Sequence, residues 1–223
     1  MIKPIKTKKT KLKICGVKNL ETLNFLLKKR VDFIGFIFFE GSPRYINLDD
    51  AEKLINKINT KSTVAVGVFV DFPLLKIQKY IKRLKLKYIQ LHGKENSNYI
   101  KTIKKNYNVK IIKAIGVKNK KDLNLINEIR GVDYFLLDYK KNKKDNLPGG
   151  NSKKFNWNLL SNFNTTKKCF LAGGIKENNI MEAISLFNPY GIDISSGVEE
   201  KLGVKSLHKI SNVVDLIKRI NEK

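Results

Sequence analysis

The sequence predicts an α/β protein that folds as a single (β/α)8 barrel, and three observations lead to this prediction. Short apolar or β-branched runs alternate with amphipathic runs along the whole chain. Each strand-plus-helix unit takes about 20 to 30 residues, which is typical of parallel strands joined by helical crossovers. Eight such units fit into 223 residues, and eight units are the number that closes a barrel.

The expected strands are short, and polar connections with Gly, Asn or Pro separate the units. The strands are Leu12–Cys15, Phe33–Phe39, Thr63–Val70, Lys87–His92, Lys110–Ile115, Tyr134–Asp138, Cys169–Ala172 and Gly191–Ser195. Between them, apolar residues recur at the spacing of one helix face, most clearly in residues 20–27, 74–84, 180–187 and 213–220. An open doubly wound sheet is the alternative. Such a sheet usually carries a glycine-rich phosphate loop after an early strand, and this sequence has none.

We expect one domain over residues 1–223, with a short basic lead-in at residues 1–11, because no linker or repeat divides the chain. No apolar run approaches the roughly 18 to 20 residues of a membrane helix, and the N-terminus lacks the apolar region of a secretion signal. The two cysteines are too few for a disulfide framework or a zinc site. We therefore predict a cytoplasmic protein without membrane association. Expected core residues include Cys169, Phe36, Phe38 and Phe39, whereas His208 is expected on the surface.

The net charge of +25 raises the question of nucleic-acid binding. Forty of the 45 basic residues are lysines, and they are spread along the chain rather than gathered in one arm or helix. Arginine, the usual residue for bidentate recognition of phosphates and bases, is scarce. This pattern favours a compositional bias over a nucleic-acid interface. We predict no nucleic-acid partner, although the charge would attract an anionic small molecule.

Polar side chains gather at the carboxyl ends of the predicted strands, where barrel enzymes carry their active sites. Because side chains alternate along a strand, the polar residues at several strand ends share the inward parity and the apolar residues the outward one. Cys15, His92, Asp138, Asp193 and Ser195 are therefore expected to meet at the mouth of the barrel. A thiol, an imidazole and two carboxylates together indicate acid–base chemistry. Alternation alone leaves the roles interchangeable among these groups.

Glycines follow the seventh and eighth strands. Gly173 and Gly174 close the seventh, and Ser195, Ser196 and Gly197 close the eighth. Exposed backbone N–H groups at these two strand ends, beside a helix N-terminus, form the phosphate site of many barrels. The sequence therefore predicts a phosphorylated substrate.

Eight short motifs, each at its own strand, resemble the phosphoribosylanthranilate isomerase family over nearly the whole chain. They are Lys13-Ile14-Cys15-Gly16, Gly35-Phe36-Ile37-Phe38, Ser42-Pro43-Arg44-Tyr45, Gly67-Val68-Phe69-Val70, Gln90-Leu91-His92-Gly93, Leu136-Leu137-Asp138, Leu171-Ala172-Gly173-Gly174 and Asp193-Ile194-Ser195-Ser196-Gly197-Val198-Glu199.

The resemblance implies a step of tryptophan biosynthesis, an Amadori rearrangement of N-(5′-phosphoribosyl)anthranilate that uses neither metal nor organic cofactor. It implies that Cys15 is the base and Asp138 the acid, and that Arg44 pairs with the anthranilate carboxylate. Lys13 is expected to favour the Cys15 thiolate. Gln90, His92 and Asp193 are expected to contact or orient the substrate, which the backbone of Gly173, Gly174, Ser195, Ser196 and Gly197 would hold by its phosphate. A monomer or a homodimer is expected.

One segment departs from the family pattern, which usually has Gly-Gly-Thr-Gly and then Phe-Asp-Trp after the sixth strand. Here the segment is Gly149-Gly150-Asn151-Ser152, followed by Phe155-Asn156-Trp157. Two alternatives stay open. One is another phosphosugar barrel: the histidine-pathway isomerase would have Asp in place of Cys15, and indole-glycerol-phosphate synthase would have catalytic Lys and Glu at strand ends. The other is a basic nucleic-acid-binding protein.

Overall fold

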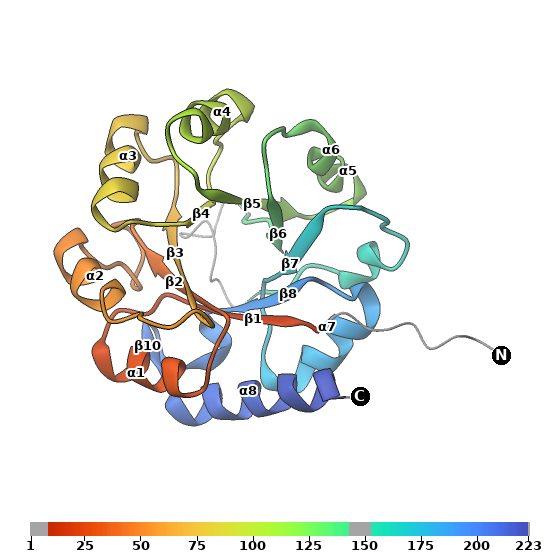
Figure 1. Ribbon diagram of the computed structural model, residues 1–223. Coiled ribbons are helices and arrows are strands. Elements are labelled where there is room, and N and C mark those ends of the chain that lie inside the picture. Colours follow the sequence, from red (N-terminus) through yellow and green to blue (C-terminus); the bar gives the residue numbers. More distant parts are fainter. Residues whose placement is uncertain (1–8, 143–152, 223) are drawn as a thin grey trace.

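Eight parallel strands close into a barrel whose order follows the sequence, as the computed structural model shows for residues 9–142 and 153–222 (Figure 1). The strands are β1 (Lys11–Cys15), β2 (Phe33–Ile37), β3 (Val64–Phe69), β4 (Tyr88–Leu91), β5 (Lys110–Val117), β6 (Tyr134–Tyr139), β7 (Lys168–Leu171) and β8 (Gly191–Ile194). Each predicted strand is confirmed to within two residues at either end. The predicted (β/α)8 barrel is therefore correct.

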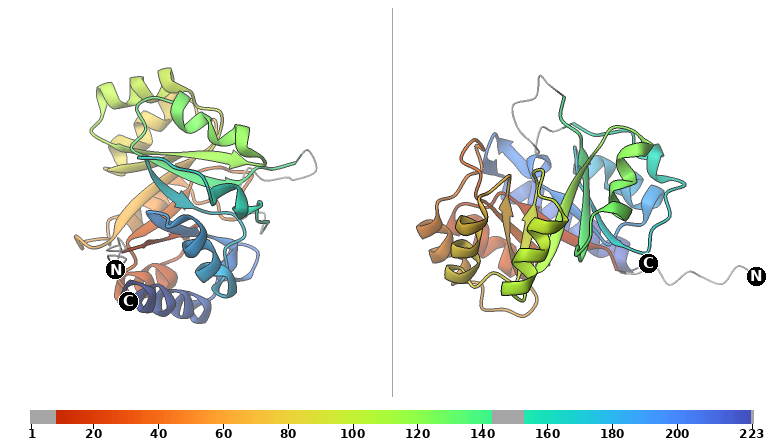
Figure 2. Two further views of the ribbon diagram at one scale, coloured as in Figure 1. Left: turned by 90° about the vertical axis from the view of Figure 1, so that its right-hand side faces the viewer. Right: turned by 90° about the horizontal axis from the view of Figure 1, so that it is seen from above.

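Helices surround the strands on the outside, as the two further views show (Figure 2). The longer ones are α1 (Leu20–Lys28), α2 (Leu48–Ile55), α3 (Leu74–Arg83), α4 (Ser97–Asn106), α7 (Ile180–Phe187) and α8 (Leu207–Glu222). Three of them begin directly after an asparagine. The side chains of Asn19, Asn47 and Asn96 each accept a hydrogen bond from a backbone N–H of the first helical turn. The described helices include none long and apolar enough to cross a membrane.

Two units differ from the expected run of long amphipathic helices. The fifth has two single turns, α5 (Lys120–Leu123) and α6 (Leu125–Glu128), which meet at Asn124. In the described part of the sixth, the helical element is the 3-10 turn η1 (Trp157–Leu160). Its first and last residues are buried. Their three-residue spacing suits a 3-10 turn, in which such side chains lie on one side.

Apolar side chains pack in two layers that follow the alternation of the strands. The inner layer fills the barrel, and its members are Phe33, Val66, Ile112, Ala114, Tyr134, Leu136, Phe170 and Ala172. The outer layer lies between strands and helices and includes Ile14, Ile89, Leu137 and Ile192. The inward and outward parities expected from the sequence are confirmed. Polar residues of inward parity at the strand ends therefore face the mouth.

A hairpin follows β8 that the sequence analysis did not predict. It consists of β9 (Glu199–Lys201) and β10 (Val204–Lys205), which pair antiparallel. Two short 3-10 turns, η2 (Glu177–Asn179) and η3 (Ser196–Val198), lie after β7 and β8. At Gly203, between the hairpin strands, a Cβ would lie 2.6 Å from the carbonyl oxygen of Pro43. The hairpin is therefore held close to the loop that carries Arg44.

Candidate active site

A pocket lies at the mouth of the barrel, among the carboxyl ends of the strands. Ten of the eleven predicted site residues line it, namely Cys15, Arg44, Gln90, His92, Asp138, Gly173, Gly174, Asp193, Ser195 and Ser196. Gly197 is not among the lining residues, and a Cβ there would overlap the carbonyl oxygen of Ile175. The pocket thus brings together residues at the carboxyl ends of β1, β4, β6, β7 and β8, as the sequence predicted.

Cys15 is the last residue of β1 and is buried. The neighbouring strand must carry a glycine, because a Cβ on Gly35 would lie 2.7 Å from the Cys15 sulfur. Burial raises the pKa of the Cys15 thiol, and this outweighs the opposite effect of the Lys13 and Lys205 ammonium groups. Lys13 acts on the thiol in the expected direction, because its charge lowers the Cys15 pKa, but burial has the larger effect.

Lys13 and Asp193 form a buried ion pair inside the barrel. The Lys13 ammonium lies 2.9 Å from Asp193 Oδ2, and β1 and β8 bring the two residues into register. Burial by itself would lower the pKa of Lys13, but Asp193 and Cys15 together outweigh it, so the pKa lies above its ordinary value. Asp193 Oδ1 is buried and has no hydrogen-bond partner among the described residues. One carboxylate oxygen is therefore paired with Lys13, and the other has no partner among the described residues.

Asp138 ends a chain of polar side chains that starts on β4. Gln90 Nε2 lies 2.8 Å from His92 Nδ1, and His92 Nε2 lies 3.4 Å from Asp138 Oδ2. The other carboxylate oxygen of Asp138 accepts a 2.7 Å hydrogen bond from the backbone N–H of Tyr139. This arrangement orients the carboxyl group. Gln90 Oε1 has no partner among the described residues.

Gly173 has a φ of +80°, which favours glycine. A Cβ there would lie 2.8 Å from both Asp138 Oδ1 and the backbone nitrogen of Tyr139. The end of β7 therefore has to be free of side chains for Asp138 to occupy its position. The expected glycine pair thus has a geometric reason in addition to the phosphate role predicted for it.

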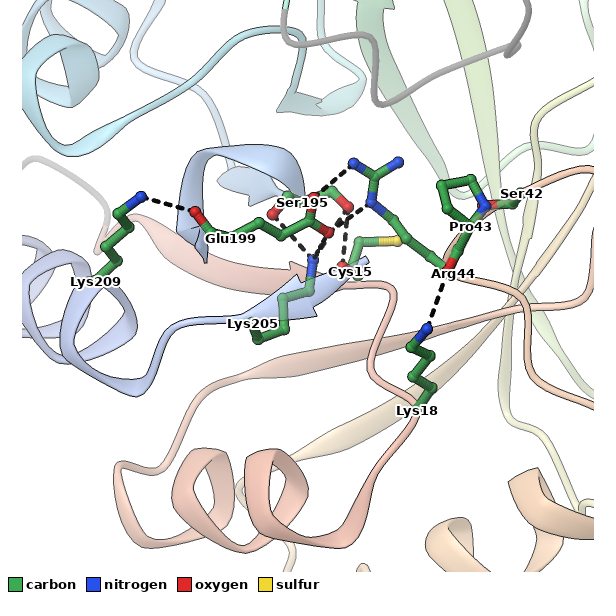
Figure 3. Close-up of polar contacts among 9 residues, drawn as sticks. All are labelled: Cys15, Lys18, Ser42, Pro43, Arg44, Ser195, Glu199, Lys205 and Lys209. Carbon is green, nitrogen blue, oxygen red and sulfur yellow. Dashed lines mark hydrogen bonds and ion pairs between the residues drawn. The ribbon is translucent and has the colours of Figure 1, made fainter. Parts of the chain in front are cut away.

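Arg44, Glu199 and Lys205 form a buried network beside the pocket (Figure 3). Arg44 Nε and Nη2 donate to the two carboxylate oxygens of Glu199 at 2.7 and 2.8 Å. The Lys205 ammonium donates to the same carboxylate at 2.9 Å. Burial would raise the pKa of Glu199, but the two cations outweigh it and hold the pKa below its ordinary value. The Arg44 guanidinium, predicted to face substrate, is thus oriented by Glu199.

Sequence reasoning missed Lys205 and named Glu199 only as part of a motif. Lys205 is one of forty lysines, so residue type carried no signal. The one available sign was the dipeptide Val204-Lys205, which directly follows Gly203 and lies close to the eighth strand in the sequence.

Other expectations met mixed outcomes. Phe36 and Phe38 are buried as predicted, but Phe39 is half-buried and lines the pocket, so its assignment to the core is wrong. Cys169 is buried, which raises its pKa to about 12, and His208 is exposed. Gly149-Gly150-Asn151-Ser152 lies outside the described residues.

Comparison with known proteins identifies the family. The family model described as N-(5'phosphoribosyl)anthranilate (PRA) isomerase matches residues 12–216. The N-(5'-phosphoribosyl)anthranilate isomerase of Rhizobium johnstonii is 39% identical over 211 residues, which are 94% of this chain and 95% of the relative.

The chain belongs to the N-(5′-phosphoribosyl)anthranilate isomerase family. Membership makes it an isomerase of tryptophan biosynthesis and confirms the resemblance. The crystal structure of the isomerase from Thermotoga maritima has a TM-score of 0.84 at 31% identity and covers 94% of this chain and 99% of that one. A structure of the isomerase in complex with reduced 1-(o-carboxyphenylamino)-1-deoxyribulose 5-phosphate has a TM-score of 0.79 at 30% identity, with the same coverage.

Proposed function

We propose that this mouth converts N-(5′-phosphoribosyl)anthranilate to 1-(2-carboxyphenylamino)-1-deoxyribulose 5-phosphate, with Cys15 as base and Asp138 as acid. The observation that carries the proposal is that a thiol from β1 and a carboxyl group from β6 line one pocket. One acid and one base, each worth about 10² to 10⁴ in rate, suit a reaction that the substrate's own nitrogen already assists.

The rearrangement needs no oxidant, reductant or second substrate. Asp138 gives a proton to the ring oxygen as the bond from that oxygen to C1′ breaks, and a Schiff base forms. The Cys15 thiolate then takes the C2′ proton, and the electron pair moves toward nitrogen to give an enolamine. C1′ gains a proton and the C2′ hydroxyl loses one, which leaves the ketone. The thiol has to lose its proton before it can act as a base, and burial opposes this loss because it raises the Cys15 pKa.

The two anionic ends of this substrate have complementary groups at the mouth. Arg44 lines the pocket and donates through Nε and Nη2 to Glu199, and a guanidinium is the side chain best matched to a planar carboxylate. We assign the phosphate to the backbone of Gly173, Gly174, Ser195, Ser196 and Gly197.

Between these ends lies the sugar. Asp193 Oδ1 and Gln90 Oε1 are buried acceptors without partners among the described residues, and buried acceptors are normally satisfied. Ribose hydroxyls are donors that would satisfy them. His92, between Gln90 and Asp138, would orient the acid.

Four further expectations remain predictions: no metal or organic cofactor, a cytoplasmic location, a monomer or a homodimer, and no nucleic-acid partner. The alternative of a nucleic-acid-binding protein draws only on the charge of +25. Tight, salt-sensitive nucleic-acid affinity at physiological salt would favour it.

Complementation tests the proposed function. A tryptophan auxotroph that lacks this isomerase is transformed with the wild type, Cys15→Ala or Asp138→Asn, at equal expression. We expect growth without tryptophan only from the wild type, because each variant lacks one of the two proton-transfer groups. Growth from either variant at the wild-type rate would remove that residue from its role.

A further inference from the structure

Lys205 is a buried cation that lies beside the pocket without lining it. Its side chain is 3% exposed. The ammonium donates to the backbone oxygen of Ser195 at 2.9 Å, to Ser195 Oγ at 3.3 Å and to Glu199 Oε1 at 2.9 Å. An ammonium has three hydrogens and here meets three acceptors. Its donor capacity is therefore used within the protein.

Each of these contacts leads to a different part of the site (Figure 3). Ser195 Oγ donates at 3.0 Å to the backbone oxygen of Cys15, which ties the eighth strand end to the strand of the base. Ser195, whose backbone oxygen accepts from Lys205, directly precedes the turn that contains Ser196 and Gly197. Glu199 holds Arg44 through two hydrogen bonds. One side chain thus connects the base strand, the predicted phosphate loop and the predicted carboxylate-binding arginine.

Charge in this network favours anions. Arg44 and Lys205 share the single carboxylate of Glu199, so these three residues carry excess positive charge next to the pocket when both cations are protonated. Burial lowers the pKa of Lys205, and Glu199 offsets part of that effect. An anion in the pocket would stabilise the charged form, because opposite charges attract strongly where water is scarce.

We propose that Lys205 is a positioning residue of the isomerase reaction, which holds the Ser195 loop and, through Glu199, Arg44 in the arrangement that receives the two anionic ends of the substrate. The inference rests on the roles proposed above for the Ser195 loop and Arg44. It assigns Lys205 no contact with substrate and no proton transfer. Its contribution lies in binding geometry, so its loss should act on substrate affinity more than on turnover.

The test compares Lys205→Met and Lys205→Gln with the wild type. The first removes charge and donors at similar length, and the second removes the charge but keeps a donor. Lys201→Met is the matched control, because Lys201 lies in the same hairpin, carries the same charge and is exposed. For each purified protein, kcat and KM are measured, together with the constant for competitive inhibition by inorganic phosphate. Far-ultraviolet circular dichroism reports folding.

We expect Lys205→Met to raise KM and the phosphate inhibition constant about tenfold each, the size of one lost charged hydrogen bond, with a smaller change in kcat. Lys205→Gln should move both constants in the same direction by less, and Lys201→Met should move neither. A merely structural role would lower the active fraction, and hence kcat, without moving KM or the inhibition constant.

Unchanged KM and phosphate inhibition in a folded Lys205 variant would overturn the proposal. So would failure of both Lys205 variants to fold, because the residue would then serve stability. Activity in Cys15→Ala or Asp138→Asn would instead contradict the proposed function. If those two variants lose activity but the Lys205 variants keep the wild-type KM and phosphate inhibition constant, only this inference would be contradicted.

Discussion

At Cys15, burial and charge act on the thiol in opposite directions. Burial raises its pKa, whereas Lys13 and Lys205 lower it and Asp193 raises it further. Asp193 thus offsets only part of the effect of Lys13 on the thiol. Lys205 shares the carboxylate of Glu199 with Arg44. Its positive charge is therefore only partly neutralised by that carboxylate.

Gly173 offers a test at the residue scale. Gly173→Ala places a methyl group 2.8 Å from Asp138 Oδ1 on a backbone with φ of +80°. We expect a loss of about 1 to 3 kcal/mol in the free energy of unfolding from the strained backbone. We also expect a fall in kcat, because the carboxyl group must move.

The control is Gly131→Ala. Gly131 has a similar φ of +78°, and a Cβ there would meet only the Ile100 side chain. This variant should lose stability but keep its kcat. Urea unfolding and steady-state kinetics measure both quantities. Equal kcat values for the two variants would contradict the need for space beside Asp138.

At the scale of elements, the strands were predictable and the connections were not. A strand end has a fixed alternation, so the inward parity of Cys15 and Asp138 followed from position alone. The hairpin β9–β10 could not be predicted, because Glu199–Lys201 is charged and Val204–Lys205 is too short to show a period. Nor could the Arg44–Glu199 pair, which joins residues 155 positions apart. The assignment of base and acid came from family resemblance.

Asp133, directly before β6, connects α4 with β5 and makes stability depend on pH. It accepts hydrogen bonds from Lys104 on α4 at 2.7 Å, from Lys110 at 3.2 Å and from the Ile111 backbone on β5 at 2.9 Å. Burial would raise the Asp133 pKa, but these donors outweigh it and lower it. A lowered pKa contributes stability above the ordinary value of about 3.9, and this is lost as pH falls through the folded-state pKa.

Asp133→Asn should therefore lower the free energy of unfolding by about 1 kcal/mol at neutral pH. The difference from the wild type should shrink at about pH 3, where the wild-type carboxylate takes up protons. Urea unfolding at both pH values measures it. The control, Asp215→Asn, removes a half-exposed carboxylate 3.6 Å from Lys29 and should change stability by less than about 0.5 kcal/mol. A difference independent of pH would contradict the linkage.

For the whole molecule, closure of the barrel depends on the junction of β1 and β8. Lys13 and Asp193 pair there inside the barrel. On the outside, the backbone of Thr10 exchanges two hydrogen bonds with the Asn221 side chain near the end of α8. The first and last elements are thus fastened to each other at both levels.

Asp193→Asn leaves the Lys13 ammonium buried without its counter-charge. We expect a loss of about 3 to 5 kcal/mol in the free energy of unfolding. The double variant Lys13→Met/Asp193→Asn should recover much of that loss, because no buried charge remains. Denaturant unfolding of both variants measures this. A double variant less stable than Asp193→Asn would contradict a dominant role for charge.

The assignment of base and acid is tested by kcat/KM for N-(5′-phosphoribosyl)anthranilate in the wild type, Cys15→Ala, Asp138→Asn and Cys169→Ala. Cys169 is the control, because it is the chain's other cysteine, is buried and lies outside the pocket. We expect Cys15→Ala and Asp138→Asn each to lose at least about 10² in kcat/KM, and Cys169→Ala to stay close to the wild type. Wild-type kcat/KM in Cys15→Ala or Asp138→Asn would contradict the assignment.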